Sequence, residues 1–125
     1  MTSYYEITAV ADGALLFHLR SAAGELLLTG GVHCSAADVL RAIEQTRRSA
    51  PMPTRYLRKN GADGSFWFIV HDANGQTLAK SEIHSLAWSR NWALERVMQL
   101  AADSPLRQPP QRPLEAEASP FRGSR

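Results

Sequence analysis

The stretch ADGALLFHLRSAAGELL, residues 11–27, occurs a second time in a related form, ADGSFWFIVHDANGQTL, at residues 62–78. Shifting the chain by fifty-one positions aligns residues 5–50 with residues 56–101 without a gap, and thirteen of the forty-six aligned pairs are identical. Self-similarity at a fixed period is typical of a repeated structural unit. The sequence therefore predicts two tandem copies of one folding unit.

Length and composition fit a single small domain. A chain of 125 residues is long enough to bury about two-thirds of its unfolded surface without metals or disulfides. We expect one domain over residues 1–105, made of a repeat at 4–51 and a repeat at 54–104. From residue 106 the sequence becomes rich in Pro, Ser and Arg and has few apolar residues. This composition predicts a disordered tail over residues 106–125.

Turn signals divide the first part of each repeat into three strands. Gly, Asp-Gly and Asn-Gly favour the positive φ angles of tight hairpin turns, and they occur at Asp12-Gly13, Gly24, Asp63-Gly64 and Asn74-Gly75. In the middle strands, alternating residues share a face. This alternation predicts that Phe17 and Phe68 point into the core.

A helix follows the three strands in each repeat. Ser35 suits an N-cap before AADVLRAIEQTRR, and Ser85 stands before the counterpart LAWSRNWALERVMQLAA. Each repeat is thus βββα. The predicted fold class is α+β: one antiparallel sheet built by both repeats, two helices on one face, and a pseudo-two-fold relation between the repeats.

Charge and cysteine content restrict the class of protein. The formal net charge is only +2, from 14 Lys and Arg against 12 Asp and Glu, which is too small an excess to indicate nucleic-acid binding. The only cysteine, Cys34, has no partner for an internal disulfide, and no secretory signal or membrane-spanning apolar run is apparent. We expect a cytoplasmic monomer with an internal pseudo-dimer and no membrane association.

Three short segments carry a resemblance to a known family. Phe66-Trp67-Phe68, Ala73-Asn74-Gly75 and Ser81-Glu82 resemble the pattern of the YegP-like family of small uncharacterised bacterial proteins, and the resemblance spans about residues 4–104. It implies a β(3)-α-β unit, present as a tandem repeat or as a dimer of single units with exchanged strands. It implies no activity. The first repeat departs from the pattern at Gly30-Gly31.

No motif in the sequence predicts catalysis or a cofactor. The serines and Cys34 lack a nucleophile-elbow or triad signature, so we expect no enzyme and no catalytic residue. Asp12 and Asp63 resemble a carboxylate pair, but hairpin chemistry already explains both. His33 and His84 occupy equivalent repeat positions and suggest a metal site with Cys34. The absence of closely spaced ligands favours aromatic packing instead.

The second helix carries the candidate contact surface. On a helical wheel, Trp88 and Trp92 lie one turn apart, opposite the apolar core side and together with Arg96 and Gln99. We expect this side to bind an unknown protein partner. Coverage by the Pro-rich tail or by a loop is an equal alternative, and the tail suits this role because prolines can stack on aromatic rings. The predicted function is a non-catalytic binding or scaffolding module.

The alternative function is single-stranded nucleic-acid binding on the open sheet face. Aromatic and basic side chains on a sheet can stack bases and neutralise phosphates. The residues expected on that face are Trp67, His71, His18 and Arg20. Cross-strand pairing of outward aromatic residues explains the same pattern and is favoured.

Overall fold

The computed structural model describes residues 2–107 and has the predicted βββα order twice. Each strand or helix of the second half begins about fifty-one residues after its counterpart in the first. The elements are β1 (Tyr4–Ala9), η1 (Ala11–Gly13), β2 (Leu15–Arg20), β3 (Leu26–Gly30), α1 (Ala36–Ser49), η2 (Pro53–Arg55), β4 (Tyr56–Asn60), β5 (Phe66–His71), β6 (Thr77–Lys80) and α2 (Ala87–Leu100).

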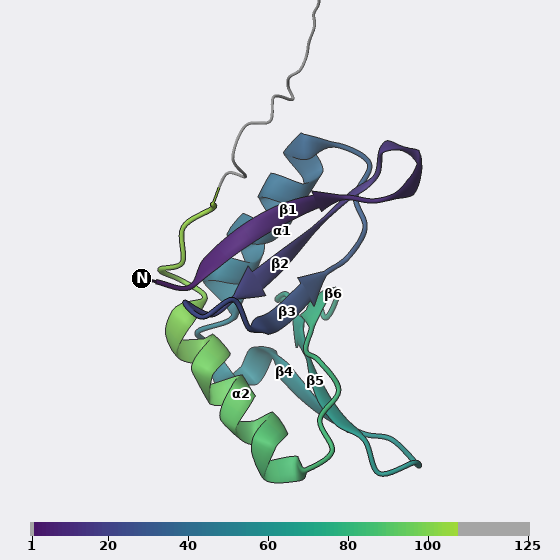
Figure 1. The fold of residues 1–125 in the computed structure, drawn as a ribbon, viewed down its shortest axis with the longest axis vertical. Helices are drawn as coiled ribbons and strands as arrows, with labels where there is room; N and C mark the ends of the chain where they lie inside the picture. Colours follow the sequence, from purple (N-terminus) through teal and green to yellow (C-terminus); the bar gives the residue numbers. More distant parts are fainter. Residues whose placement is uncertain (1, 108–125) are drawn as a thin grey trace, which may run out of the picture.

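The six strands form one antiparallel sheet in the order β1-β2-β3-β6-β5-β4 (Figure 1). The halves join where β3 pairs with β6, through Thr29 opposite Lys80 and Gly30 opposite Ala79. Thr29 and Lys80 are equivalent positions, fifty-one residues apart. An antiparallel pair between equivalent positions is what a two-fold axis through this seam generates. The α+β fold class is confirmed, and the pseudo-two-fold relation stays a prediction.

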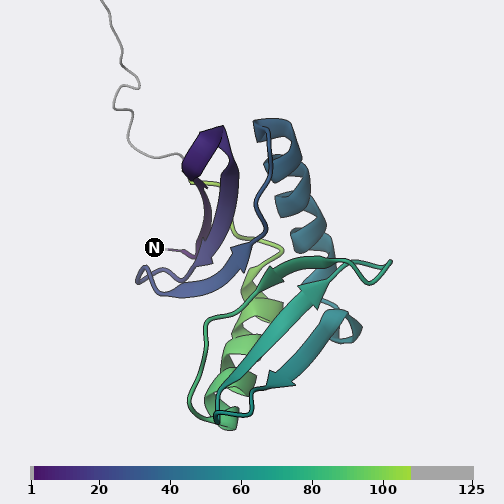
Figure 2. The same ribbon diagram turned by 90° about the vertical axis from the view of Figure 1, so that its right-hand side faces the viewer.

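Both helices cover the same face of the sheet and enclose a single core (Figure 2). Helix α1 packs on β2, β5 and β6, whereas α2 packs on β5 and β3. Phe17 and Phe68 are completely buried between the layers. The alternation of β2 and β5 therefore has the predicted phase, and each helix contacts strands of both halves.

The two helices begin differently. At α1 the side chain of Ser35 accepts a hydrogen bond from the Asp38 backbone N–H over 3.2 Å, which is an N-cap of the expected kind. The expectation that Ser85 begins the second helix is wrong by one residue: the N-cap is Leu86, which has no side-chain acceptor. Leu86 stands fifty-one residues after Ser35, so the repeat position is kept while the capping group is lost.

Two buried tyrosines tie each half to a helix end. The Tyr56 hydroxyl donates to the Ala50 carbonyl at the end of α1 over 2.6 Å. The equivalent Tyr5 hydroxyl donates to the Ala101 carbonyl at the end of α2 over 2.8 Å. The Tyr5 ring also packs edge-on against Phe17. Strand β1 is therefore bonded to the end of α2, and the equivalent strand β4 is bonded to the end of α1.

The segment after α2 lies against β1. The Tyr5 backbone N–H donates to the Pro105 carbonyl, the Arg107 N–H donates to the Tyr5 carbonyl, and Leu106 forms a parallel bridge to Tyr5. Leu106 and Arg107 were expected in the tail, and this part of the expectation is corrected, because both make backbone contacts with the sheet. The remainder of the predicted tail, residues 108–125, lies outside the described residues.

Candidate functional site

The candidate surface is the outer side of α2. The indoles of Trp88 and Trp92 are 67% and 58% exposed, while Leu94 and Val97 on the opposite side are buried. Trp88 and Trp92 are four residues apart and so lie on one face of the helix. The helix therefore has the predicted rotational phase. Two neighbouring exposed indoles form an apolar patch on this helix face, and such patches can mark interaction sites.

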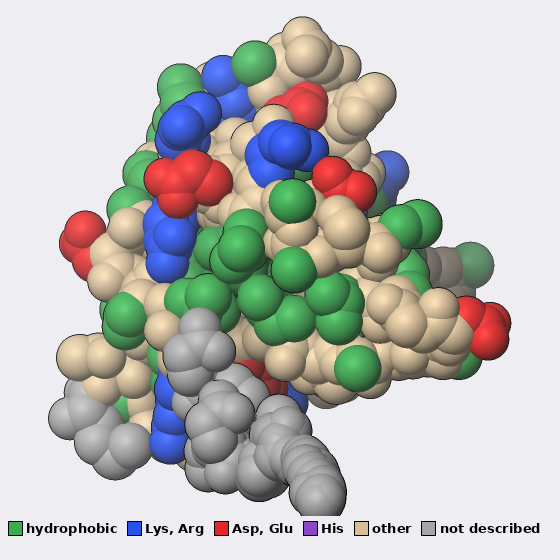
Figure 3. All heavy atoms as spheres, turned by 90° about the horizontal axis from the view of Figure 1, so that it is seen from above, with side chains coloured by type: hydrophobic (Ala, Val, Ile, Leu, Met, Phe, Trp, Pro, Cys, Tyr) green, Lys and Arg blue, Asp and Glu red, His purple; other side chains and the backbone are tan. Residues whose placement is uncertain are grey.

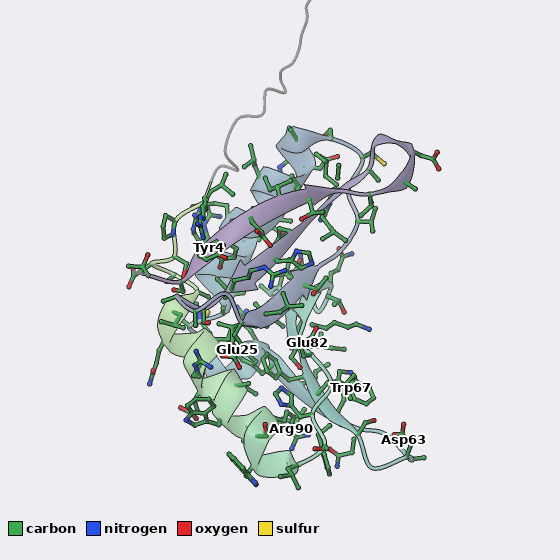
Figure 4. All side chains as sticks on the ribbon, in the orientation of Figure 1. Tyr4, Glu25, Asp63, Trp67, Glu82 and Arg90 are labelled. Atoms are coloured by element: carbon green, nitrogen blue, oxygen red, sulfur yellow. The ribbon has the colours of Figure 1, made fainter. Side chains whose placement is uncertain are left out.

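Arg96 links this face to the first half of the molecule. Its guanidinium carbon lies 4.8 Å from the centre of the Trp92 ring, which is a cation–π distance. Its Nη1 donates to Glu25 Oε1 over 2.9 Å. Glu25 lies in the β2–β3 turn, and Figure 4 shows it on the side of the sheet facing α2. Glu25 thus holds Arg96 in place, and the cation–π contact with Arg96 orients the Trp92 ring.

A pocket of roughly 520 Å³ adjoins the C-terminal half of α2. Arg96 and Gln99, two of the predicted contact residues, line it. Its other lining residues come from the start of the chain, the β2–β3 turn and the end of the helix: Thr2, Ser3, Ser21, Ala22, Leu100 and Asp103. The indoles and this pocket together form the "α2 surface": Trp88, Trp92, Arg96, Gln99 and the pocket lining.

The corresponding side of α1 has a different chemistry. Ala37 and Arg41 stand fifty-one residues before Trp88 and Trp92. Arg41 Nη1 pairs with Asp38 Oδ1 over 3.1 Å, and both side chains are well exposed. The same helix position thus functions in the fold without an indole. The exposed aromatic pair is a property of the second half alone.

The alternative site on the other sheet face is split between two distant strands. His18 and Arg20 lie on β2, whereas Trp67 and His71 lie on β5, with β3 and β6 between them. All four side chains are half-buried. Figure 4 shows Trp67 beside β5. The four predicted residues do not form one stacking platform.

Acidic groups neutralise much of the positive charge on this face. Arg20 Nε donates to Glu6 Oε1, and His18 Nδ1 lies 3.7 Å from the same oxygen. Burial, helped by the nearby Arg20 charge, lowers the pKa of His18, although Glu6 and Glu82 oppose the shift. His18 is therefore mostly neutral at pH 7 and supplies little attraction for phosphate. Figure 3 shows a different side of the molecule, on which basic and acidic side chains also lie next to one another, beside a group of hydrophobic side chains.

The histidines and aspartates considered as ligands are kept apart. His33 pairs with Leu15 at the start of β2, and His84 pairs with Phe66 at the start of β5. Cys34 is exposed. Asp12 and Asp63 lie in hairpins at opposite edges of the sheet. Within residues 2–107, no group of three or more His, Cys, Asp or Glu side chains is placed to hold a metal ion.

Hydrogen bonds from Ser65 lower the pKa of Asp63. Both the hydroxyl and the backbone N–H of Ser65 donate to its Oδ1. Such bonds stabilise the carboxylate form and are typical of an Asx turn.

In the part of the chain that the structure describes, no helix is long and apolar enough to cross a bilayer.

Sequence comparison identifies relatives over most of the chain. No family model matches. The UPF0339 protein YegP of Shigella flexneri is 29% identical over 97 residues, which are 78% of this chain and 88% of the relative. A UPF0339 protein of Bordetella pertussis is 28% identical over 105 residues, or 84% of this chain and 94% of the relative.

Two solution structures have the same architecture. That of yegP from Escherichia coli has a TM-score of 0.79 at 25% identity and covers 85% of this chain and 91% of its own. A UPF0339 protein from Shewanella oneidensis has the same TM-score and coverage at 21% identity, which supports the fold alone. The predicted resemblance is confirmed: in sequence and in fold, this chain is similar to the YegP-like UPF0339 proteins.

Proposed function

We propose that this protein is a non-catalytic binding module whose contact with a protein partner is made by the α2 surface. The observation that carries the proposal is the exposed pair Trp88 and Trp92 on one helix face. Tryptophan is enriched among the residues that dominate binding energy at interfaces. The equivalent positions Ala37 and Arg41 support the view that folding does not require these indoles.

The shape of the surface favours a grooved partner. Trp88, Trp92 and Arg96 project from successive turns of one helix, which is the spacing used when a helix enters an apolar groove. Arg96 already pairs with Glu25, so the helix side chains are partly ordered before binding. Such preorganisation lowers the entropy lost on association. We further propose that the module is a cytoplasmic monomer.

The test compares a double variant with a matched control. Full-length protein, Trp88→Ala/Trp92→Ala and Leu57→Ala are immobilised and exposed to extract of the source cell. Leu57 is an exposed apolar residue on β4, so its variant controls for general loss of apolar surface. Retained proteins are identified by quantitative mass spectrometry. A partner that the wild type and Leu57→Ala retain, and the double variant loses, is the expected result.

Affinity measured with that purified partner then gives the size of the effect. Loss of one hot-spot indole weakens binding by about 2 kcal/mol or more, which is roughly a 30-fold change. Circular dichroism and thermal unfolding check that the double variant is folded. If all three proteins retain the same partners with the same affinity, the α2 surface is not the contact site.

A titration with single-stranded oligonucleotides separates the alternative function. Binding on the sheet face would quench Trp67 fluorescence, weaken steeply with salt and be lost in Trp67→Ala. With Arg20 held by Glu6, we expect no saturable binding at micromolar concentration. Saturable, salt-sensitive binding that depends on Trp67 would favour nucleic acid over a protein partner.

A further inference from the structure

A second pocket lies between the end of α1, in the first half of the molecule, and the β5–β6 turn, in the second half. Its volume is roughly 280 Å³. The lining residues come from α1, from the link to β4 and from the turn: Gln45, Arg48, Ser49, Met52, Arg55, Asp72, Ala73 and Asn74. It shares none of its lining with the α2 surface.

Two arginines in this pocket have no acidic partner in the part of the chain that the structure describes. Within residues 2–107, neither the Arg48 nor the Arg55 guanidinium makes an ion pair or a side-chain hydrogen bond, and Arg55 Nε is shielded from solvent without an acceptor. Four other arginines in the same part of the chain pair with carboxylates: Arg20, Arg41, Arg47 and Arg96. A shielded N–H donor without an acceptor is rare in folded proteins and can mark the place of a bound water, ion or ligand.

The second half of the molecule has no arginine at the equivalent positions. Gln99 and Leu106 occupy the equivalent positions, fifty-one residues after Arg48 and Arg55. A basic residue in the last turn of α1 also interacts favourably with the helix dipole, but Arg47 lies in that turn as well and donates to the Ser104 carbonyl. Arg55 lies outside the helix, so the dipole does not explain it.

The charges in the pocket favour an anion. Asp72 is the one acidic residue of the lining, and its Oδ1 accepts the backbone N–H groups of Asn74 and Gln76 over 2.8 and 3.0 Å. The pocket lining therefore contains two arginines and one carboxylate, and the turn already engages that carboxylate. Guanidinium groups match the oxygens of phosphate in paired hydrogen bonds.

A neighbouring hollow offers space for the rest of a ligand. It has a volume of roughly 350 Å³ and shares Gln45 and Asp72 with the arginine pocket. Its lining includes the apolar side chains of Val32 and Leu78, the amide of Gln76, and the Arg41–Asp38 ion pair. We propose that Arg48 and Arg55 bind the phosphate of a small organic phosphate whose organic part lies in this hollow.

The test uses orthophosphate and phenyl phosphate as probes on the full chain. Chemical shifts of the arginine Nε–Hε groups are followed by NMR during each titration, with sodium chloride at equal ionic strength as the reference. We expect saturable shifts of Arg55 Nε–Hε with both phosphates and tighter binding of phenyl phosphate. Equal affinity for the two probes would identify free phosphate as the ligand and overturn the organic part of the proposal.

Variants separate the site from general basicity. Arg48→Gln/Arg55→Leu reproduces the residues of the second half, so it is expected to fold, and its phosphate affinity should fall at least roughly tenfold. Arg58→Gln removes an exposed arginine on β4 whose Nε donates to Asn91 and which lines neither hollow, and it should leave the affinity unchanged. Asp72→Asn removes the opposing charge and should raise it.

Two further results bear on the same site. Arg55→Lys keeps the charge but loses Nε–H, and should also weaken binding if the fork geometry matters. The proposal is overturned if chloride produces the same shifts, or if Arg48→Gln/Arg55→Leu binds phosphate as tightly as the wild type.

Discussion

The two strand-to-helix junctions have the same place in the repeat but opposite side-chain solutions. In the first half the junction residue is Gly30, and a methyl group built there would lie 2.1 Å from Cε2 of the buried Phe17 ring. In the second half it is Ser81, whose hydroxyl accepts the Phe68 backbone N–H over 3.0 Å and donates to the Glu82 carbonyl over 2.9 Å. An aromatic ring covers the first junction, and a hydroxyl satisfies the backbone at the second.

The repeat position therefore requires filled volume and paired backbone groups, not a particular residue. Close packing leaves no room for a change at one site without adjustment at its neighbours. The aromatic ring and the junction residue therefore act as a pair in each half.

The largest expected effect is at the first junction. Gly30→Ala forces the Phe17 ring to move within a packed core and should lower the free energy of unfolding by about 3 kcal/mol, the upper part of the overpacking range. Ser81→Ala leaves the Phe68 N–H without its acceptor and should cost about 1–2 kcal/mol. Urea unfolding of the two variants measures the difference. If Gly30→Ala leaves the free energy of unfolding unchanged, the position of the Phe17 ring does not depend on a glycine at residue 30.

An intermediate effect is expected where the tyrosines meet the helix ends. Tyr5→Phe and Tyr56→Phe each leave a buried carbonyl, at Ala101 or Ala50, without its donor. Each should lose about 1–2 kcal/mol. Similar losses would show that the two halves are energetically equivalent. A large inequality between the two variants would break that equivalence.

The same tyrosines predict alkaline sensitivity. Burial raises the pKa of both hydroxyls above 10.0. A raised pKa in the folded state means that the unfolded chain loses its protons first, so stability is fully present below pH 10 and falls as the pH rises above it. In Tyr5→Phe/Tyr56→Phe, the loss of stability above pH 10 should be much smaller in thermal unfolding curves.

The smallest effect is expected at the helix N-caps. Ser35→Ala removes the acceptor for the Asp38 N–H and should destabilise by about 1 kcal/mol. Leu86→Ser supplies the acceptor that α2 lacks and should stabilise by up to about 1 kcal/mol. Denaturant midpoints measure both changes. Loss of stability in Leu86→Ser would indicate that the exposed leucine makes a contact worth more than a cap.

The fold was predictable because its signals are local. Asp12 and Gly13 have φ angles of 63° and 77°, as the hairpin chemistry of Asp-Gly requires. The alternation around Phe17 and Phe68 fixed the buried face. The bridge of Leu106 to Tyr5 is a single residue pair, so it has no periodic pattern that a sequence could reveal.

The site was predictable only in part. The helical wheel placed Trp88 and Trp92 outward because exposure along one helix follows from spacing alone. The pairing of Arg96 with Glu25, and the arginine pocket with Arg55, join residues from different halves or elements. Such contacts depend on which turn the helix crosses, and neither periodicity nor composition encodes that crossing.

The tyrosine contacts have a consequence for the connectivity of the chain. Tyr56 reaches Ala50 across a short loop, whereas Tyr5 makes the equivalent contact to Ala101, ninety-six residues away. Residues 104 and 105 lie beside residues 3 and 5, where Ser104 and Ser3 share a hydrogen bond of 2.6 Å. The start of β1 and the segment after α2 therefore lie side by side. The same strands and helices can form with the chain connected in a different order. A circular permutant opened in the loop after α1 and joined beside Tyr5 would trace the same architecture.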